Sequence, residues 1–173
     1  MQQPQVVELN MQKIAKQNIW LSVILVIAFT IVYKIMYGQT NFSFLSILMI
    51  AILYIILIVL HEAFHLIGFM IFGRAKYKEL NYGVNLKLGV AYATTVKPLP
   101  NRAMKKALLL PFWTTGVCPT FLGFYIESIA FVIVGALLIA GAIGDFVMYK
   151  ELRKFPKDAL IKDDPELPKL YVY

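Results

Sequence analysis

Charged residues are scarce in this chain of 173 residues, where they make up 16% and hydrophobic residues make up 60%. A soluble domain usually has about a quarter charged residues. Together with the mean hydropathy of +0.69, this composition excludes a soluble globular domain and a disordered chain. It predicts a single integral-membrane domain over residues 1–173, an all-α bundle of about four transmembrane helices.

Cysteine and histidine are also rare. The one cysteine, Cys118, excludes an internal disulfide. Because it lies in an apolar run, we interpret it as a packing residue rather than a reactive thiol. The chain has two histidines, and both fall within one apolar run.

Long apolar runs occur four times, and each is long enough to cross a hydrocarbon core of about 30 Å. We expect the second run to tilt, to bend near Gly68 or to protrude, because it is longer than the membrane requires. We expect the third to be kinked or to begin at Pro111. The predicted helices cover residues 19–37, 42–73, 107–126 and 128–149.

The basic residues are distributed very unevenly. All of the 17 lysines and arginines except Lys34 fall in three segments that four spans place on the same side. Basic residues collect on the cytoplasmic side of membrane proteins. This pattern predicts a multi-pass protein of the cell membrane with both termini in the cytoplasm. It also explains the net charge of +7. The expected partner is therefore the lipid bilayer, and nucleic acid is not an expected partner.

The segment 74–106 between the second and third runs has a strand-like pattern. Apolar residues alternate with others from Val84 to Tyr92, and turn residues precede them. We therefore predict a short β-hairpin or β-loop within residues 78–96, with an irregular basic loop as the alternative. The tail, residues 150–173, is polar and contains three prolines, so we expect it to be extended.

The second run contains His61-Glu62-Ala63-Phe64-His65, an H-E-x-x-H motif. The spacing of four residues places both imidazoles on one helix face, where they could share a metal ion, with zinc the natural candidate. Glu62 could act as general base towards a water at that ion. An ionisable group within a membrane span is costly and therefore a functional candidate. The alternative is a polar cluster that joins helices by hydrogen bonds.

A catalytic zinc site needs a third protein ligand. The acids in or beside the other spans are Asp145 and Glu127. At 1.5 Å of rise per residue, Asp145 and the two histidines both lie in the cytoplasmic part of the bundle, whereas Glu127 lies at the outer end. We therefore predict Asp145 as the third ligand, with a helix cap or a salt bridge as its alternative role, and Glu127 as a solvated turn residue.

Small residues lie close to the predicted ligands. Gly68 lies on the same helix face as the histidines. Gly141 lies one turn before Asp145, and Gly144 directly precedes it. Small residues allow membrane helices to approach closely. We expect these glycines to bring the second and fourth helices together, in addition to ordinary packing.

The H-E-x-x-H helix followed by Gly144-Asp145 in the last span resembles the site-2 protease class of intramembrane zinc metalloproteases. Most of the chain, including a tail with Asp163-Asp164-Pro165, resembles a family of small bacterial membrane proteins described as zincin peptidases. The resemblance implies a polytopic peptidase with Glu62 as base and with His61, His65 and Asp145 as zinc ligands. In site-2 proteases the third ligand typically precedes a glycine, whereas Asp145 precedes Phe146.

The function predicted from these features is a zinc-dependent metalloendopeptidase that cleaves membrane-embedded or membrane-adjacent proteins or peptides. Two alternatives stay open, a non-proteolytic metal-binding scaffold and a metal-ion transporter. An intact Glu62 argues against a degenerate peptidase. Transport usually needs polar groups along the whole path, and the second run offers little before His61 except Tyr54.

Overall fold

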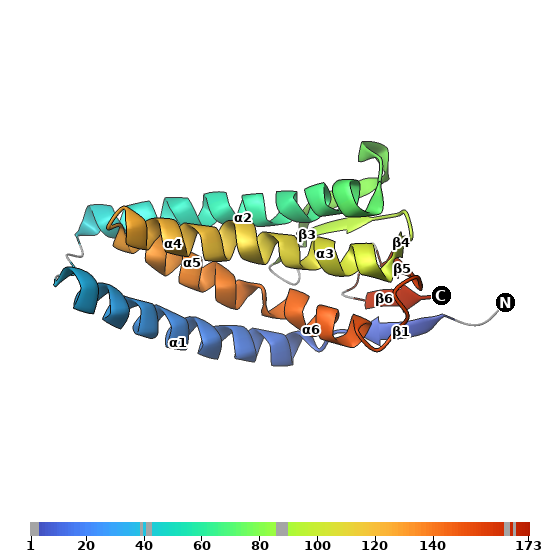
Figure 1. Cartoon of the computed structure of the whole chain (residues 1–173), viewed down its shortest axis with the longest axis horizontal. Helices are drawn as coiled ribbons and strands as arrows, with labels where there is room; N and C mark the ends of the chain where they lie inside the picture. The colour runs from blue at the N-terminus through green and yellow to red at the C-terminus, as the bar shows by residue number, and fades with distance from the viewer. Residues whose placement is uncertain (1–3, 39, 41–42, 86–89, 165–166, 168) are drawn as a thin grey trace. The chain divides into compact units, whose positions relative to one another are not determined.

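The structure is a computed structural model, which describes residues 4–38, 40, 43–85, 90–164, 167 and 169–173. Four helical segments within these residues are long and apolar enough to cross a membrane, as predicted. They are built from α1 (Met11–Tyr37), α2 (Phe44–Gly73), α3 (Asn101–Pro111) with α4 (Cys118–Tyr125), and α5 (Ile129–Gly141) with α6 (Ile143–Leu152) (Figure 1). The predicted all-α membrane class with a short β-element is therefore confirmed.

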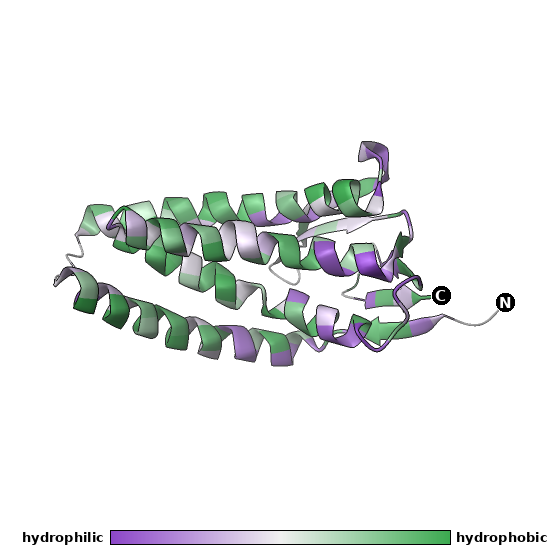
Figure 2. Cartoon of the chain, in the orientation of Figure 1, coloured by the Kyte–Doolittle hydropathy of each residue, from purple (hydrophilic) through white to green (hydrophobic). Residues whose placement is uncertain are grey.

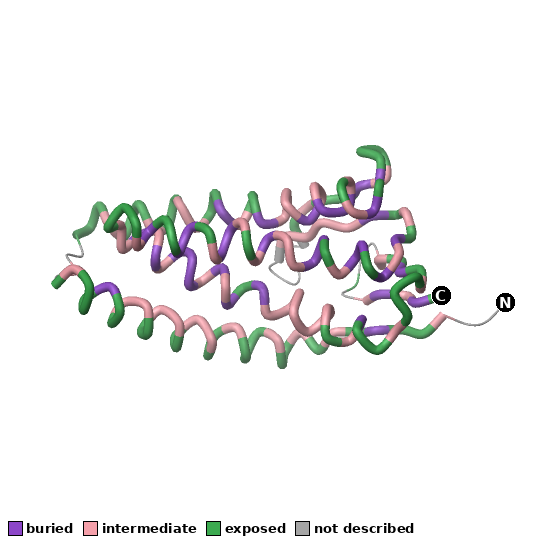
Figure 3. The backbone as a smooth tube through the Cα atoms, in the orientation of Figure 1, coloured by how far each residue is buried: buried purple, intermediate pink, exposed green. Residues whose placement is uncertain are grey.

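Hydrophobic residues occupy most of the length of these helices (Figure 2). The apolar windows of α1 and α2 have only 6% of their residues buried, whereas the windows of the other two spans have 44%. Figure 3 shows this difference as the largely exposed and intermediate colours of α1. Apolar side chains exposed all along a helix are expected where the surrounding solvent is lipid.

Two of the helical segments begin well before their predicted bounds. Helix α1 begins at Met11, eight residues before the apolar run. The third span begins at Asn101 and passes through a π-helical segment, Phe112–Val117, directly after Pro111. Proline removes a hydrogen bond from a helix interior, and the wider π-turn follows it here.

Cys118 is exposed on α4, so its interpretation as a packing residue is wrong.

The strands form two small antiparallel sheets. β2 (Leu80–Asn85) pairs with β3 (Val90–Thr95), so the hairpin predicted within residues 78–96 is present. Its details were wrong, because the predicted turn residues at 81–83 lie inside β2 and the strand pattern at 84–92 covers parts of both strands. Residues 86–89 of that prediction lie outside the described residues. A second sheet has the order β1-β6-β5-β4, from β1 (Gln5–Glu8), β6 (Lys169–Val172), β5 (Leu160–Asp163) and β4 (Leu99–Pro100).

This second sheet was not predicted, because the tail was expected to be merely extended. Its strands alternate buried and exposed residues, so that one face of each strand enters a core. Since β1 pairs with β6, the first and last strands of the chain lie side by side.

The chain divides into two compact units. The first comprises residues 1–11, 62–111 and 144–173, and the second comprises residues 12–61 and 112–143. The core of the first unit joins the sheet to α3 and to the end of α6, through buried Leu99, Met104, Leu152, Ile161 and Leu170.

Asn101 organises the first unit around the start of α3. Its side chain is 0% exposed. The amide nitrogen donates to the carbonyl oxygens of Leu152, Phe155 and Pro156 at 2.8–3.1 Å. These carbonyls end α6 and form the following turn, so the asparagine joins α3 to the helix that carries Asp145.

The second unit is held by close helix packing and by a tyrosine pair. Thr120 of α4 lies so close to Gly135 of α5 that a Cβ there would be 2.1 Å from its Oγ1. The hydroxyls of Tyr33 and Tyr37 donate to the carbonyls of Glu127 and Phe124. Glu127 therefore lies in the α4–α5 turn, where its φ is 54°.

A close approach of α2 and α3 supports the motif helix. A Cβ on Gly68 would lie 2.8 Å from Cα of Ala107 and 2.9 Å from its Cβ. By contrast, nothing lies within 4 Å of a Cβ added to Gly141. The prediction that Gly68 and Gly141 bring the second and fourth helices together is therefore wrong. Gly68 packs on the third span instead, and a side chain at Gly141 would meet no neighbouring atom.

Gly68→Ala should therefore destabilise the protein by about 1–3 kcal/mol, because the added methyl group must displace the α3 backbone. Gly141→Ala is the matched control and should be neutral or slightly stabilising, since alanine favours a helix over glycine by up to about 1 kcal/mol. Thermal unfolding of the two variants in the same detergent compares them. Equal stability of both variants would contradict the close α2–α3 contact.

Candidate metal centre

Helix α2 places both motif imidazoles on one side. His61 and His65 are one turn apart and buried, at 8% and 6% exposure, whereas Glu62 is partly buried. Because α2 is continuous from Phe44 to Gly73, helical geometry alone fixes the two imidazoles next to each other.

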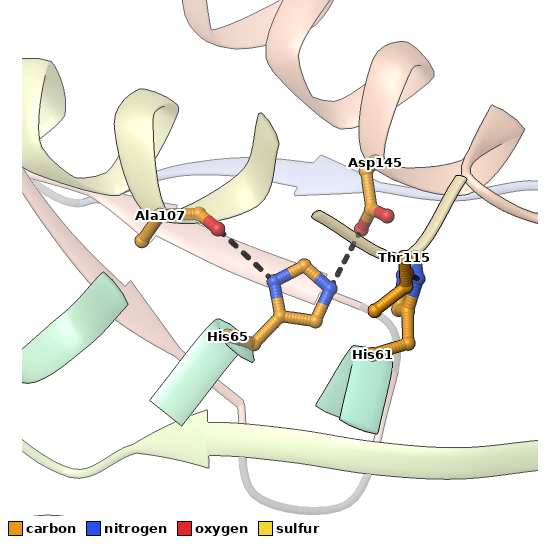
Figure 4. A network of polar contacts seen from close by, with 5 residues as sticks. All are labelled: His61, His65, Ala107, Thr115 and Asp145. Carbon is orange, nitrogen blue, oxygen red and sulfur yellow. Dashed lines mark hydrogen bonds and ion pairs between the residues drawn. The ribbon is translucent and has the colours of Figure 1, made fainter. Parts of the chain in front are cut away.

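His65 is held from two sides (Figure 4). Its Nδ1 lies 3.2 Å from the carbonyl oxygen of Ala107, and its Nε2 lies 3.4 Å from Oδ1 of Asp145. A carbonyl oxygen only accepts, so Nδ1 must donate. In a neutral imidazole this leaves a lone pair on Nε2, facing a carboxylate that also only accepts. Two such acceptors lie together only when a proton or a metal ion is between them.

His61 is held through the same ring position. Its Nδ1 lies 3.0 Å from Oγ1 of Thr115, which is 1% exposed. Thr115 belongs to the π-helical segment Phe112–Val117, and π-turns often occur at functional sites because they redirect side chains. Both histidines therefore use Nδ1 for a contact that orients the ring.

The three predicted ligands offer one ligand atom each within 4.8 Å of one another. Ligand atoms that share a tetrahedral zinc ion at 2.0–2.2 Å lie roughly 3.4 Å apart, and the His65–Asp145 pair is at 3.4 Å. Two imidazoles and one carboxylate are a donor set that suits zinc. The residues therefore fit the metal, and their role as ligands stays a prediction. Glu127 is not in this group.

His65 packs against an aromatic ring on one side and faces a partly exposed carboxylate on the other. The ring of Phe69, one turn further along α2, stacks on His65 with centroids 6.4 Å apart. The Asp145 side chain is 19% exposed. A catalytic zinc site needs such an open side for water and substrate.

Two groups at this centre escaped the sequence analysis. Thr115 lies 54 residues from His61, and no spacing rule connects the two. The Ala107 contact comes from a backbone carbonyl, which no side-chain pattern can reveal. Gly68, however, was noticed in the sequence, and its contact with Ala107 brings that carbonyl to His65.

A membrane-type helix bundle with an H-E-x-x-H pair and a third carboxylate defines a metallopeptidase type of centre. Residues 54–160, more than half of the chain, match the family described as "putative zincin peptidase", and the chain belongs to this family. Membership supports a metallopeptidase in general, and the family name implies zinc. Neither a curated protein nor a solved structure gave a match.

Thr115→Val should weaken zinc binding by about 10–100-fold, because groups that orient a ligating histidine typically have effects of this size. Valine keeps the shape and removes the hydroxyl, so Thr115→Ser should restore most of the affinity. Competition with a chromophoric chelator measures both.

Thr120→Val is the matched control for this pair. Its hydroxyl donates to the Gly116 carbonyl at 2.8 Å, so zinc affinity should stay at the wild-type value. If Thr115→Val bound zinc as tightly as the wild type, the orienting role of Thr115 would be wrong.

Proposed function

We propose that this chain is an intramembrane zinc metalloprotease that cleaves peptide bonds of membrane-embedded or membrane-adjacent substrates. The observation that carries the proposal is the arrangement of His65, whose Nε2 faces the Asp145 carboxylate while Nδ1 donates to Ala107. A proton or a metal ion between the two groups satisfies this arrangement, and His61 one turn away supplies the third donor that supports a metal ion.

In this scheme His61, His65 and Asp145 hold the metal. Zinc supplies a Lewis acid that polarises the scissile carbonyl and makes water at the site more acidic. Glu62, partly buried beside His61, accepts a proton from the attacking water and passes it to the leaving amine. The Ala107 carbonyl and the Thr115 hydroxyl keep the two imidazoles oriented throughout.

The hairpin offers a means of holding an extended substrate. Within the described residues β2 and β3 form a two-stranded sheet. The N–H of Val96 donates to the Glu79 carbonyl just before β2. Because backbone groups alternate in direction along an antiparallel pair, those of Ala91 and Ala93 point away from β2. A substrate strand could pair with this edge. A transmembrane substrate must first unwind there, because helical amides are already hydrogen-bonded.

We place both termini and the hairpin in the cytoplasm of a bacterial cell. The pairing of β1 with β6 supports termini on one side of the membrane, as an even number of spans requires. The basic residues of segments 74–106 and 150–173 support the cytoplasmic side.

Zinc content tests the ligand set. Purified protein should hold about one zinc per chain, as expected for one tetrahedral site, and His65→Ala and Asp145→Ala should each lose most of it. Glu127→Asn is the control: it keeps a residue that tolerates the positive φ and should retain zinc. Zinc retained in Asp145→Ala would reveal a different third ligand, and a folded wild type without zinc would overturn the proposal.

Glu62→Gln should keep the metal and slow cleavage by about 10²–10⁴-fold, the usual contribution of general acid–base catalysis. A panel of single-span peptides in lipid nanodiscs and unstructured casein serve as substrates, with product formation followed by mass spectrometry. Glu151→Gln is the matched control, because Glu151 pairs with Lys154 at the end of α6.

The outcomes of this experiment separate the proposed protease from the two alternatives. Cleavage by Glu62→Gln at the wild-type rate would remove the general base from the scheme. Zinc bound without any cleavage would favour a metal-binding scaffold. Zinc flux into proteoliposomes would favour a transporter.

A further inference from the structure

A carboxylate that the mechanism does not use lies at the end of β5. The Thr95 N–H of β3 donates to Asp163. Burial raises the pKa of Asp163 to about 7, against the opposing effect of the Thr95 N–H. Asp163 is thus a desolvated acid, and it contacts the β3 edge that the proposed function assigns to substrate.

A cavity of about 200 Å³ adjoins this carboxylate. This exceeds by far the roughly 10–15 Å³ needed by one water. The cavity lies between the hairpin and β5. Most of its accessible surface is apolar, and charged groups come from two of its lining residues: Asn81, Thr94, Thr95, Val96, Lys162 and Asp163.

One of the lining residues, Thr94, carries a hydroxyl group that has no exposed surface and no partner among the described residues. Oγ1 of Thr94 is buried and makes no hydrogen bond within the described residues. Thr94 is paired with Asn81 across the hairpin, so both side chains lie on the same face of the hairpin. A buried polar atom without a partner is rare and costly. Rotation of the Thr94 side chain towards the cavity would relieve this cost if a ligand there supplied the missing hydrogen bond.

The chemistry of these groups selects a cation that donates hydrogen bonds. The ionised form of Asp163 only accepts hydrogen bonds and repels an anion, and a bound cation would favour this form over the neutral form that burial favours. Lys162 is exposed, so solvent screens its opposing charge. A strand paired along Ala91 and Ala93 would reach Thr95 next, and side chains of an added strand enter pockets beside the edge.

We propose that this cavity is a substrate subsite that takes a lysine or arginine side chain, with Asp163 as its charge partner and Thr94 as its hydrogen-bond partner. The inference rests on the proposed function and names its substrate class: segments with a basic residue near the scissile bond.

Cleavage specificity tests the subsite first. A proteome-derived peptide mixture treated with the zinc-loaded protein should show lysine or arginine enriched at one position near the cleaved bond. Matched peptides with lysine or norleucine at that position then give the selectivity. Asp163→Asn should lower the lysine preference by about 10–100-fold, mainly through KM, because a hydrogen bond to a charged group is lost. Its amide oxygen can still accept from Thr95, so the fold should persist.

Two further variants sharpen this test. Thr94→Val should lower the same preference by a smaller factor. Asp158→Asn is the matched control, since this exposed acid pairs with Arg102 at 3.6 Å on the surface and should leave the preference unchanged. Cleavage without a basic preference, or a preference that Asp163→Asn leaves intact, would overturn the subsite.

A binding experiment separates the subsite from the peptidase. N-acetyl-lysine methylamide, titrated into protein with labelled threonine methyl groups, should shift the Thr94 signal saturably, and N-acetyl-norleucine methylamide should not. Asp163→Asn should abolish the shift, and Glu62→Gln should keep it. Saturation without any peptide cleavage would leave the subsite standing and sink the proposed function, whereas the absence of saturation would overturn the subsite itself.

Discussion

The position of the His65 imidazole, between the Ala107 carbonyl and the Asp145 carboxylate, is the constraint on which the rest of the centre depends. The carbonyl fixes the proton on Nδ1, and this directs a lone pair at an acceptor. A protein interior does not tolerate two facing acceptors unless a proton or a metal ion lies between them. The two contacts of His65 therefore fix the orientation of its ring and the kind of ligand that its Nε2 can face. Both contacts require α2, α3 and α6 to meet within one compact unit.

Several features of the first unit serve this meeting. Gly68 removes the side chain that would keep α2 away from Ala107, so the same close contact that packs the helices also brings the carbonyl to His65. Asn101 ties the start of α3 to the end of α6, which limits how far Asp145 can move. The terminal strands add a sheet that completes the core around Leu99 and Ile161. The ends of the chain thus support a centre that lies far from them in sequence.

The centre and the hairpin together suggest why a small membrane protein could handle an extended polypeptide. The motif helix leads directly into β2 and β3, so the backbone groups that could hold a substrate follow the ligands in the chain. Asp163 contacts the end of that edge from the opposite terminus. Chemistry, backbone pairing and side-chain selection would then come from α2, β3 and the tail respectively.

The four spans, the hairpin and the grouping of His61, His65 and Asp145 were predictable from the sequence, because hydropathy, strand alternation and helical spacing are local patterns. The ends of the spans were not, since polar residues such as those from Gln12 to Asn18 extend α1 without an apolar signal. The pairing of the tail with β1 depends on contacts across the whole chain length, which no local pattern encodes.

The sequence by itself determined the membrane character of this protein and the side-chain chemistry of its centre, because both depend on residue types and their spacing. Only the tertiary structure decided which atoms orient that centre. The Ala107 carbonyl, the Thr115 hydroxyl and the Asp163 carboxylate act through distance and direction, and these are set by how distant segments pack. Glycine shows the same division: Gly68 and Gly141 look equivalent as small residues, yet close packing gives one a neighbour within van der Waals distance and leaves the other in open space.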